Sequence, residues 1–187
     1  MDAVVFLHLP KTGGMSFGEI VVRQFSPRAR LHADASDLAT FQALWGGLAE
    51  GRRAAVRCIH GHLPFGVQAV LPPPVRCVTL LRDPVDRVVS AYHYALRRPE
   101  VVPHRELVEG RVTLHEYVTG ELSADVHDAQ TRILGGDPGP RAGGRDVLER
   151  AMGNLAAHGV VVGLCERFDE SALLCRRVLG WHDVRYV

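Results

Sequence analysis

The sequence predicts an α/β fold of three layers, with helices on both faces of a mainly parallel central sheet. Short apolar runs alternate along the chain with longer helical patterns, which is the order of strand–helix–strand units. The apolar runs are hydrophobic at nearly every residue, as strands of a parallel sheet are when both faces are covered. The chain has 187 residues, of which 47% are hydrophobic, and these values predict one domain, residues 1–187.

The first predicted elements are a strand and a helix joined by a glycine loop. Ala3–Leu9 is rich in β-branched and bulky apolar residues and stops at Pro10, which indicates a buried strand. A helical pattern then occupies Ser16–Phe25, and a second occupies Ala35–Gly47. The next apolar run, Ala54–Ile59, predicts the second strand.

Prolines mark the third strand and the helix that follows it. Pro72–Pro74 excludes regular structure just before the predicted strand Arg76–Leu81. A helical pattern then covers Pro84–Arg98. Proline is tolerated in the first turn of a helix, and Asp83 is placed to cap this one.

The second half of the chain continues the alternation. Helical patterns at Thr113–Gly120 and Gly144–His158 precede the fourth apolar run, Gly159–Leu164. A last helix is predicted at Asp169–Leu179, and Trp181–Val187 resembles the start of another strand. This ending leaves open that the domain is truncated at its C-terminus.

The charge balance of the chain excludes a broad basic surface. The 22 Lys and Arg against 21 Asp and Glu leave a net charge of +1, so nucleic acid is not expected as a partner. No stretch is long and apolar enough to predict a membrane span, and no secretion signal is recognisable. The four cysteines lack CxxC spacing and pair with no histidine motif, which predicts free thiols, no metal site and a reducing, cytoplasmic location.

A lysine and two glycines stand at the junction of the first strand and the first helix. Lys11 is the only lysine in the chain. Glycines let backbone N–H groups turn toward a ligand, and the following helix presents the positive end of its dipole. A compact ammonium on a flexible stem suits a phosphate group in such a site. The predicted anion-binding residues are Lys11, Thr12, Gly13, Gly14, Met15 and Ser16.

A second candidate site begins at the end of the third strand. Arg82 ends that strand, and Ser90 follows about two turns into the next helix. An arginine at the carboxyl end of a strand points into the crevice where open α/β sheets bind ligands. A guanidinium fork with a hydroxyl suits a second phosphate. Taken alone, the segment is equally compatible with an arginine that caps its own helix and a serine that fills a helix face.

Together, the two motifs resemble those of the sulfotransferases that use 3′-phosphoadenosine 5′-phosphosulfate (PAPS). In that family a Pro-Lys-Thr-Gly-Gly-Thr-Ser loop holds the 5′-phosphosulfate, and it matches Pro10–Ser16. An Arg–x7–Ser segment of the family holds the 3′-phosphate and matches Arg82 and Ser90. The resemblance implies a P-loop NTPase-like sheet and PAPS as cofactor, with adenosine 3′,5′-bisphosphate (PAP) as product. Met15 stands where the family usually has threonine, so a hydroxyl is missing from the loop and we expect weaker binding of the phosphosulfate.

A His-Gly-His segment extends the resemblance. Ile59–Gly66 contains His60 and His62, and it is similar to a segment of the branch with heparan sulfate 2-O-sulfotransferase-like and related bacterial enzymes. In the 2-O-sulfotransferase-like enzymes a histidine there is the general base, which implies this role for His62 first and for His60 second. Two residues apart in an extended segment, they are expected to share a face. Two structural histidines at a strand end are the alternative. Gln130–Gly135 and Val162–Ser171 also resemble the family.

The function that these residues predict is transfer of a sulfuryl group from PAPS to an acceptor hydroxyl, on a carbohydrate or a small molecule. Such a displacement depends mainly on positioning and on charge stabilisation. Lys11 would stabilise the charge on the leaving oxygen, and a histidine would take the proton of the acceptor. His8, in the first strand, is expected to be packed rather than chemical.

Two other functions remain open at this point. One is a non-catalytic module that binds PAP. The other is a P-loop kinase, although the kinase loop places its lysine after the glycines, whereas Lys11 precedes them. The oligomeric state and the identity of the acceptor are not predicted.

Overall fold

A parallel sheet forms the centre of the molecule, which the computed structural model describes for residues 2–101, 103–120, 122–123, 126–136 and 144–186. In this part of the chain the strand order is β2-β3-β1-β4-β5, and all four neighbouring pairs are parallel. The strands are β1 (Ala3–Leu7), β2 (Arg30–His32), β3 (Cys58–Gly61), β4 (Val75–Leu81) and β5 (Val161–Leu164). The prediction of a mainly parallel central sheet is therefore confirmed.

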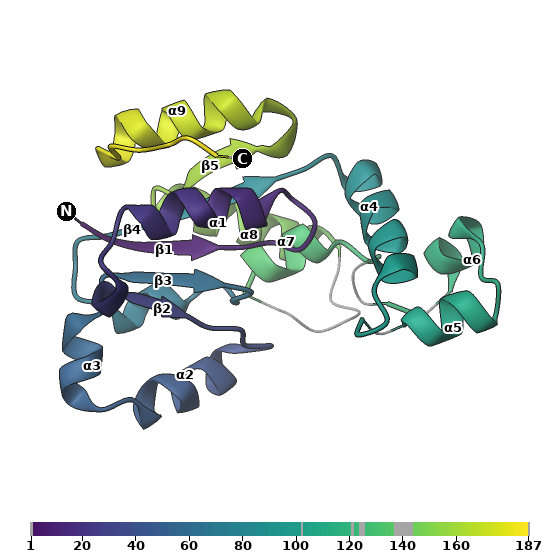
Figure 1. Cartoon of the computed structure of the whole chain (residues 1–187), viewed down its shortest axis with the longest axis horizontal. Helices are drawn as coiled ribbons and strands as arrows, with labels where there is room; N and C mark the ends of the chain where they lie inside the picture. Colours follow the sequence, from purple (N-terminus) through teal and green to yellow (C-terminus); the bar gives the residue numbers. More distant parts are fainter. Residues whose placement is uncertain (1, 102, 121, 124–125, 137–143, 187) are drawn as a thin grey trace.

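Helices connect the strands and lie on both sides of the sheet (Figure 1). The α-helices are α1 (Gly14–Arg23), α2 (Leu38–Gly47), α3 (Glu50–Ala55), α4 (Pro84–Arg97), α5 (His104–Glu109), α6 (Leu114–Thr119), α7 (Ala129–Leu134), α8 (Arg145–Ala157) and α9 (Phe168–Leu179). Short 3-10 helices are η1 (Pro27–Ala29), η2 (Val67–Val70) and η3 (Cys165–Arg167).

The alternating side chains of β1 divide the core into two layers. Val5 and Leu7 belong to a cluster that α2, η2, α7 and α8 complete on one face of the sheet. Val4 and Phe6 belong to a second cluster on the other face, where α1 and α9 pack. All of these β1 side chains are buried, which explains why the strand is hydrophobic throughout. The prediction of three layers is confirmed.

A smaller cluster lies beside the carboxyl edge of the sheet. It joins α4, α5 and α6 through the buried residues Ala95, Leu107 and Tyr117. Figure 1 shows these helices projecting to one side of the sheet, next to the ends of β1 and β4. The cluster therefore provides a second wall at the edge where α/β proteins bind ligands.

Several predicted boundaries differ from the structure. The strand predicted at Ala54–Ile59 begins only at Cys58, because Ala54 and Ala55 end α3. β2 was not predicted: its three residues, Arg30–His32, are partly buried or exposed and form no apolar run. The strand predicted to start at Trp181 is also wrong, because no strand is present among the described residues from Trp181 to Tyr186. Trp181 is instead buried against Phe17, with ring centroids 5.9 Å apart.

The predicted start of α4 is confirmed in detail. Oδ1 of Asp83 accepts hydrogen bonds from the backbone N–H groups of Val85, at 2.9 Å, and Asp86, at 3.0 Å. Pro84 occupies the first turn, where its missing N–H leaves no bond unmade. A further bond, from the Asp83 N–H to Oε1 of Glu166 at 2.8 Å, ties this helix start to η3.

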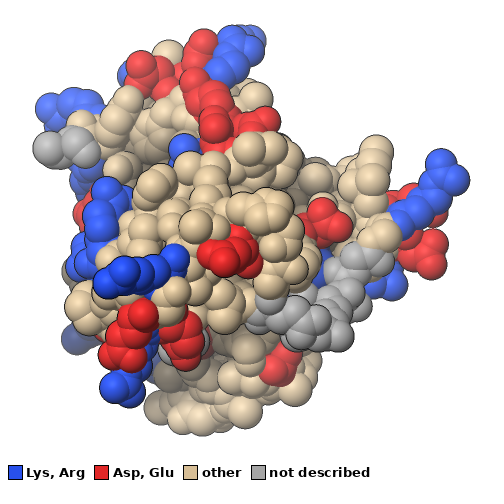
Figure 2. Space-filling model, turned by 90° about the vertical axis from the view of Figure 1, so that its right-hand side faces the viewer, with Lys and Arg blue, Asp and Glu red and all other residues tan. Residues whose placement is uncertain are grey.

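The surface carries charges of both signs. Figure 2 shows basic and acidic side chains next to one another in small groups on one face, with uncharged surface between the groups. The four cysteines are free thiols, as predicted, and Cys58, Cys77 and Cys175 are buried. Within the described residues, no helix has the length and apolar composition needed to cross a membrane. The same residues contain no group of three or more His, Cys, Asp or Glu placed to hold a metal ion.

Candidate functional site

The loop between β1 and α1 has the geometry of an anion site. Lys11 and Gly13 both have positive φ angles, 66° and 80°, and Gly13 is the N-cap of α1. The cap has no side-chain hydrogen bond, and the first turn contains no acidic residue. The N–H groups at the start of α1 are therefore not engaged by a capping side chain, and the helix dipole favours an anion beside them.

Two residues of this loop serve its structure. A Cβ on Gly14 would lie 1.9 Å from Cδ2 of His8, so only glycine lets the helix start pack against the His8 ring. Thr12 is buried, and its hydroxyl donates to the backbone oxygen of Leu9 at 2.9 Å. The Thr12 hydroxyl therefore holds the turn, and the place of Thr12 among the anion-binding residues stays a prediction. Met15 and Ser16 do line the cavity, and Met15 is 76% exposed.

Arg82 connects the second motif directly to the first. One guanidinium nitrogen, Nη1, donates to the backbone oxygen of Lys11 at 3.2 Å. The backbone of Arg82 is held by Gln130 of α7: the Arg82 N–H donates to Oε1 of Gln130 at 2.9 Å, and Nε2 of Gln130 donates to the Arg82 oxygen at 2.8 Å. Since Asp83 caps α4, Arg82 does not, and its guanidinium extends toward the loop.

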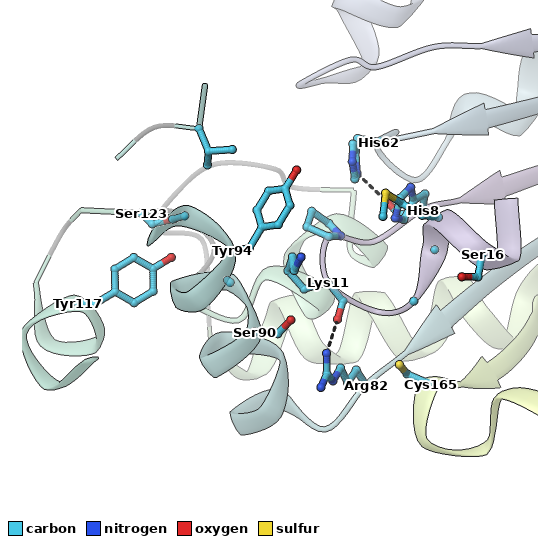
Figure 3. Close-up of a pocket in the computed structure, with 17 residues that line it drawn as sticks. His8, Lys11, Ser16, His62, Arg82, Ser90, Tyr94, Tyr117, Ser123 and Cys165 are labelled. Atoms are coloured by element: carbon cyan, nitrogen blue, oxygen red, sulfur yellow. Dashed lines mark hydrogen bonds between the residues drawn. The ribbon is translucent and has the colours of Figure 1, made fainter. Parts of the chain in front are cut away.

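Both motifs open into one cavity of about 420 Å³ (Figure 3). Its size is that of a small-molecule site, for which about 300–1,000 Å³ is usual. Ser90, Ala91, Tyr94 and Ala95 of α4 form one wall. The remaining lining residues are His8, Pro10, Lys11, Gly13, Gly14, Met15, Ser16, His62, Arg82, Val101, Tyr117, Ser123 and Cys165.

His62 lies in this cavity with its ring fixed on two sides. Its Nδ1 is 2.9 Å from the backbone oxygen of His8, and because that oxygen can only accept, Nδ1 must donate. Nε2 is then the nitrogen with a free lone pair. The ring stacks on the His8 ring, with centroids 4.4 Å apart. The backbone N–H of His62 donates a hydrogen bond to Oδ1 of Asp34 at 2.8 Å.

His60 does not accompany His62 into the cavity. It belongs to β3, and its ring meets the edge of His32 on β2, with centroids 5.0 Å apart. Gly61, between the two histidines, has a φ of 140° and breaks the alternation of a regular strand. Burial, with charge repulsion from His32 and Arg30, lowers the pKa of His60. The expectation that both histidines share a face is therefore wrong, and the geometry favours His62.

His8 lies just beyond β1 with its ring packed against its neighbours, as expected, and the same ring also lines the cavity. Its ring lies between Phe6, at a centroid distance of 5.8 Å, and His62. Burial is the main reason that its pKa is lowered to about 4. The charged groups that act on it are His62, His32 and His60, which lower the pKa, and Asp34, which raises it.

This lowered pKa predicts a loss of stability in mild acid. Between about pH 6.5 and 4 the unfolded chain binds a proton at this position that the folded chain does not, so folding weakens as the pH falls. Replacing His8 by Phe keeps a flat ring but removes the titration. Between about pH 7.5 and 5, wild type should lose about 2 kcal/mol more stability than His8→Phe in urea denaturation. Equal losses in the two proteins would contradict this account.

The fold adds residues that the motifs did not indicate. Tyr94 lies one turn beyond Ser90 on the same face of α4, and that spacing could have indicated it. Tyr117 and Ser123 lie in and after α6, and no local pattern distinguishes them. Asp34 accepts from the backbone N–H of His62, a contact that a linear motif cannot reveal, whereas Gln130 begins one of the segments that the resemblance had already indicated.

Comparison with solved structures identifies the fold. The mouse sulfotransferase SULT7A1, solved in complex with PAP, matches this chain with a TM-score of 0.51 over 100% of the chain, at 16% identity. A sulfotransferase from Alicyclobacillus acidocaldarius has the same TM-score and identity and also matches over 100% of this chain. The fold is that of the sulfotransferases.

This likeness extends to the fold alone. The chain spans 60% of the length of the mouse protein and 83% of the length of the bacterial one. No protein-family model matches the sequence, and a search of curated proteins finds no similar sequence. The sulfotransferase fold has a P-loop NTPase-like sheet, and the predicted fold class is confirmed to that extent.

Proposed function

We propose that this chain is a sulfotransferase that moves a sulfuryl group from PAPS to a hydroxyl of a small acceptor molecule, with His62 as general base. The observation that carries the proposal is the meeting of Lys11, Arg82, Ser90 and His62 around one cavity. These residues come from segments up to 79 positions apart in the sequence, and each has a type suited to a separate part of the reaction. The sulfotransferase fold supports the same reaction class.

The residues present fit a nucleotide with two phosphate ends. The N–H groups at the start of α1 and the Lys11 ammonium would hold the 5′-phosphosulfate, while Arg82 and Ser90 would hold the 3′-phosphate. When bound, PAPS would supply the sulfuryl group, whose bond to the 5′-phosphate oxygen breaks as the acceptor oxygen bonds to sulfur. Lys11 would stabilise the negative charge that develops on that 5′-phosphate oxygen.

His62 is suited to take the acceptor proton. Its Nδ1 donates to the His8 backbone oxygen, so Nε2 is left to accept. The stacked His8 ring and the bond to Asp34 hold His62 in place before an acceptor arrives. The His60-Gly61-His62 segment also supports a place near the heparan sulfate 2-O-sulfotransferase-like branch, in which a histidine of this segment is the base.

The apolar part of the cavity lining favours a small acceptor over a carbohydrate. Tyr94, Ala95, Val101 and Tyr117 contribute aromatic or aliphatic side chains to the lining, and Ser123 adds one hydroxyl beside them. Such a lining suits an acceptor with an apolar body and one hydroxyl better than a sugar with many hydroxyls, whose hydrogen bonds to water would be lost.

Calorimetric titration with PAP, adenosine 5′-phosphate and ATP tests the nucleotide site. We expect micromolar binding of PAP that depends on the 3′-phosphate, and a loss of about 10- to 100-fold in Arg82→Ala, since hydrogen bonds to charged groups contribute about 1.5–3 kcal/mol. Arg97→Ala, which removes an exposed arginine at the end of α4, should bind PAP as wild type does. Preference for ATP would favour the kinase, and no binding of any nucleotide would exclude the proposed site. PAP binding without transfer to any acceptor would favour the non-catalytic module.

A further inference from the structure

The ammonium of Lys11 lies on the face of an aromatic ring. Its Nζ is 3.7 Å from the centroid of the Tyr94 ring. At this distance the cation is in direct contact with the negative face of the ring, and cation–π attraction extends to about 6 Å. Figure 3 shows Tyr94 on α4 beside Lys11 and on the same side of the cavity as Ser90.

This contact is the second one between Lys11 and the segment that carries the 3′-phosphate residues. Arg82 binds the backbone oxygen of Lys11, while Tyr94 contacts its ammonium. Tyr94 follows Ser90 by four residues, so both side chains lie on one face of α4. The helix that would bind one phosphate therefore also restrains the lysine that would bind the other.

Contact with a ring does not by itself prevent an ammonium from binding an anion. A lysine ammonium has three N–H donors, and a ring on one side does not use those on the other side. The lysine stem is flexible, and a ring that holds the ammonium removes freedom that binding would otherwise have to remove. The ring is half-buried and lines the cavity, so it can act at the place where the 5′-phosphate would lie.

We propose that Tyr94 is a positioning residue for Lys11, which holds the ammonium toward the 5′-phosphate before the nucleotide binds. This inference rests on the proposed nucleotide site. It requires the aromatic ring and not the tyrosine hydroxyl, so Tyr94→Phe should bind PAP with wild-type affinity. Tyr94→Leu keeps an apolar side chain but removes the ring, and it should weaken PAP binding about three- to tenfold.

A second cation near the ring offers a matched control. The guanidinium carbon of Arg98 lies 5.7 Å from the Tyr94 centroid, and Arg98 also pairs with Glu100 at 3.5 Å. Arg98 is exposed. If Tyr94 acts through Lys11, Arg98→Met should leave PAP affinity unchanged.

A double-mutant cycle decides whether Tyr94 acts through Lys11. PAP dissociation constants are measured by calorimetry for wild type, Tyr94→Leu, Lys11→Met and the double variant, with the melting temperature of each as a check on folding. We expect Tyr94→Leu to weaken binding in wild type and to have no further effect in Lys11→Met, because the ammonium that the ring holds is absent there.

The outcomes separate this inference from the function on which it rests. Equal effects of Tyr94→Leu in both backgrounds would show that Tyr94 contributes independently of Lys11, and would overturn the inference alone. Tighter binding by Tyr94→Leu would also overturn it, since the ring would then compete with the phosphate for the ammonium. Failure of the wild-type protein to bind PAP would overturn the proposed nucleotide site, and the inference with it.

Discussion

Replacement of His62 by Gln is expected to lower sulfuryl transfer about 10²- to 10⁴-fold, the usual contribution of a positioned general base. Glutamine retains a polar side chain of similar length but cannot take up a proton near neutral pH. The residues assigned to the nucleotide belong to the β1–α1 loop and to the segment from Arg82 to Ser90, and His62 is not among them, so the Kd for PAP should stay within about twofold of wild type. The loss should therefore appear in transfer and not in nucleotide binding.

The measurement uses radiolabelled PAPS with a panel of small hydroxyl compounds, followed by comparison of variants on the best acceptor. His60→Gln is the matched control, because His60 is two residues away and meets His32 instead of the cavity. It should retain transfer near the wild-type rate. Loss of transfer in His60→Gln, with activity kept in His62→Gln, would reverse the assignment of the base.

The fold was predictable where one strand or helix carries its own signal. β1 is apolar over its whole length, and β4 and β5 over most of theirs, because helices cover the sheet on both faces, and that pattern is visible without a structure. β2 was not predictable, because it is a three-residue strand at the edge of the sheet whose pairing with β3 supplies its order. The six-residue helices α3, α5 and α7 are short and have no side-chain cap, whereas α6, of the same length, was predicted and begins with a capping box of Thr113 and Glu116.

The candidate site was likewise predictable only where its residues lie close together in the sequence. The loop from Lys11 to Ser16 is contiguous, and Arg82 with Ser90 occupies a single strand–helix junction, so the sequence contains both groups in readable order. Their meeting in one cavity depends on the neighbouring positions of β1 and β4 in the sheet. The choice between His60 and His62 depended on the φ angle of one glycine, which residue types alone do not determine.

That glycine, Gly61, gives the largest expected effect on stability. Its φ of 140° is a conformation that side chains rarely adopt, and a Cβ there would lie 2.0 Å from the backbone oxygen of Ala33 and 3.0 Å from Oδ1 of Asp34. Backbone strain of this kind costs about 1–3 kcal/mol, and overpacking costs about 1–3 kcal/mol more. Gly61→Ala should therefore lower the free energy of unfolding by about 2–6 kcal/mol.

Gly153→Ala is the control for this change, because a Cβ at Gly153, inside α8, meets nothing within 4 Å. That substitution should stabilise the protein by about 0.5–1 kcal/mol, the usual gain of alanine over glycine in a helix. Urea denaturation of the two variants tests the contrast. A Gly61→Ala protein within about 1 kcal/mol of wild type would mean that the segment beside it can move away at little cost.

The same substitution should reach His62 through the backbone. The methyl group would displace the segment from Ala33 to Ala35, which is hydrogen-bonded to the backbone before and after Gly61. The N–H of Ala33 donates to the His60 oxygen at 3.0 Å, and the N–H of Ala35 donates to the His62 oxygen at 2.9 Å. Asp34 accepts from the His62 N–H at 2.8 Å. Under conditions where Gly61→Ala is still folded, we therefore expect it to lose transfer more than PAP binding, as His62→Gln does. Nucleotide binding lost in step with transfer would mean that Gly61 supports the whole edge of the sheet and not the base alone.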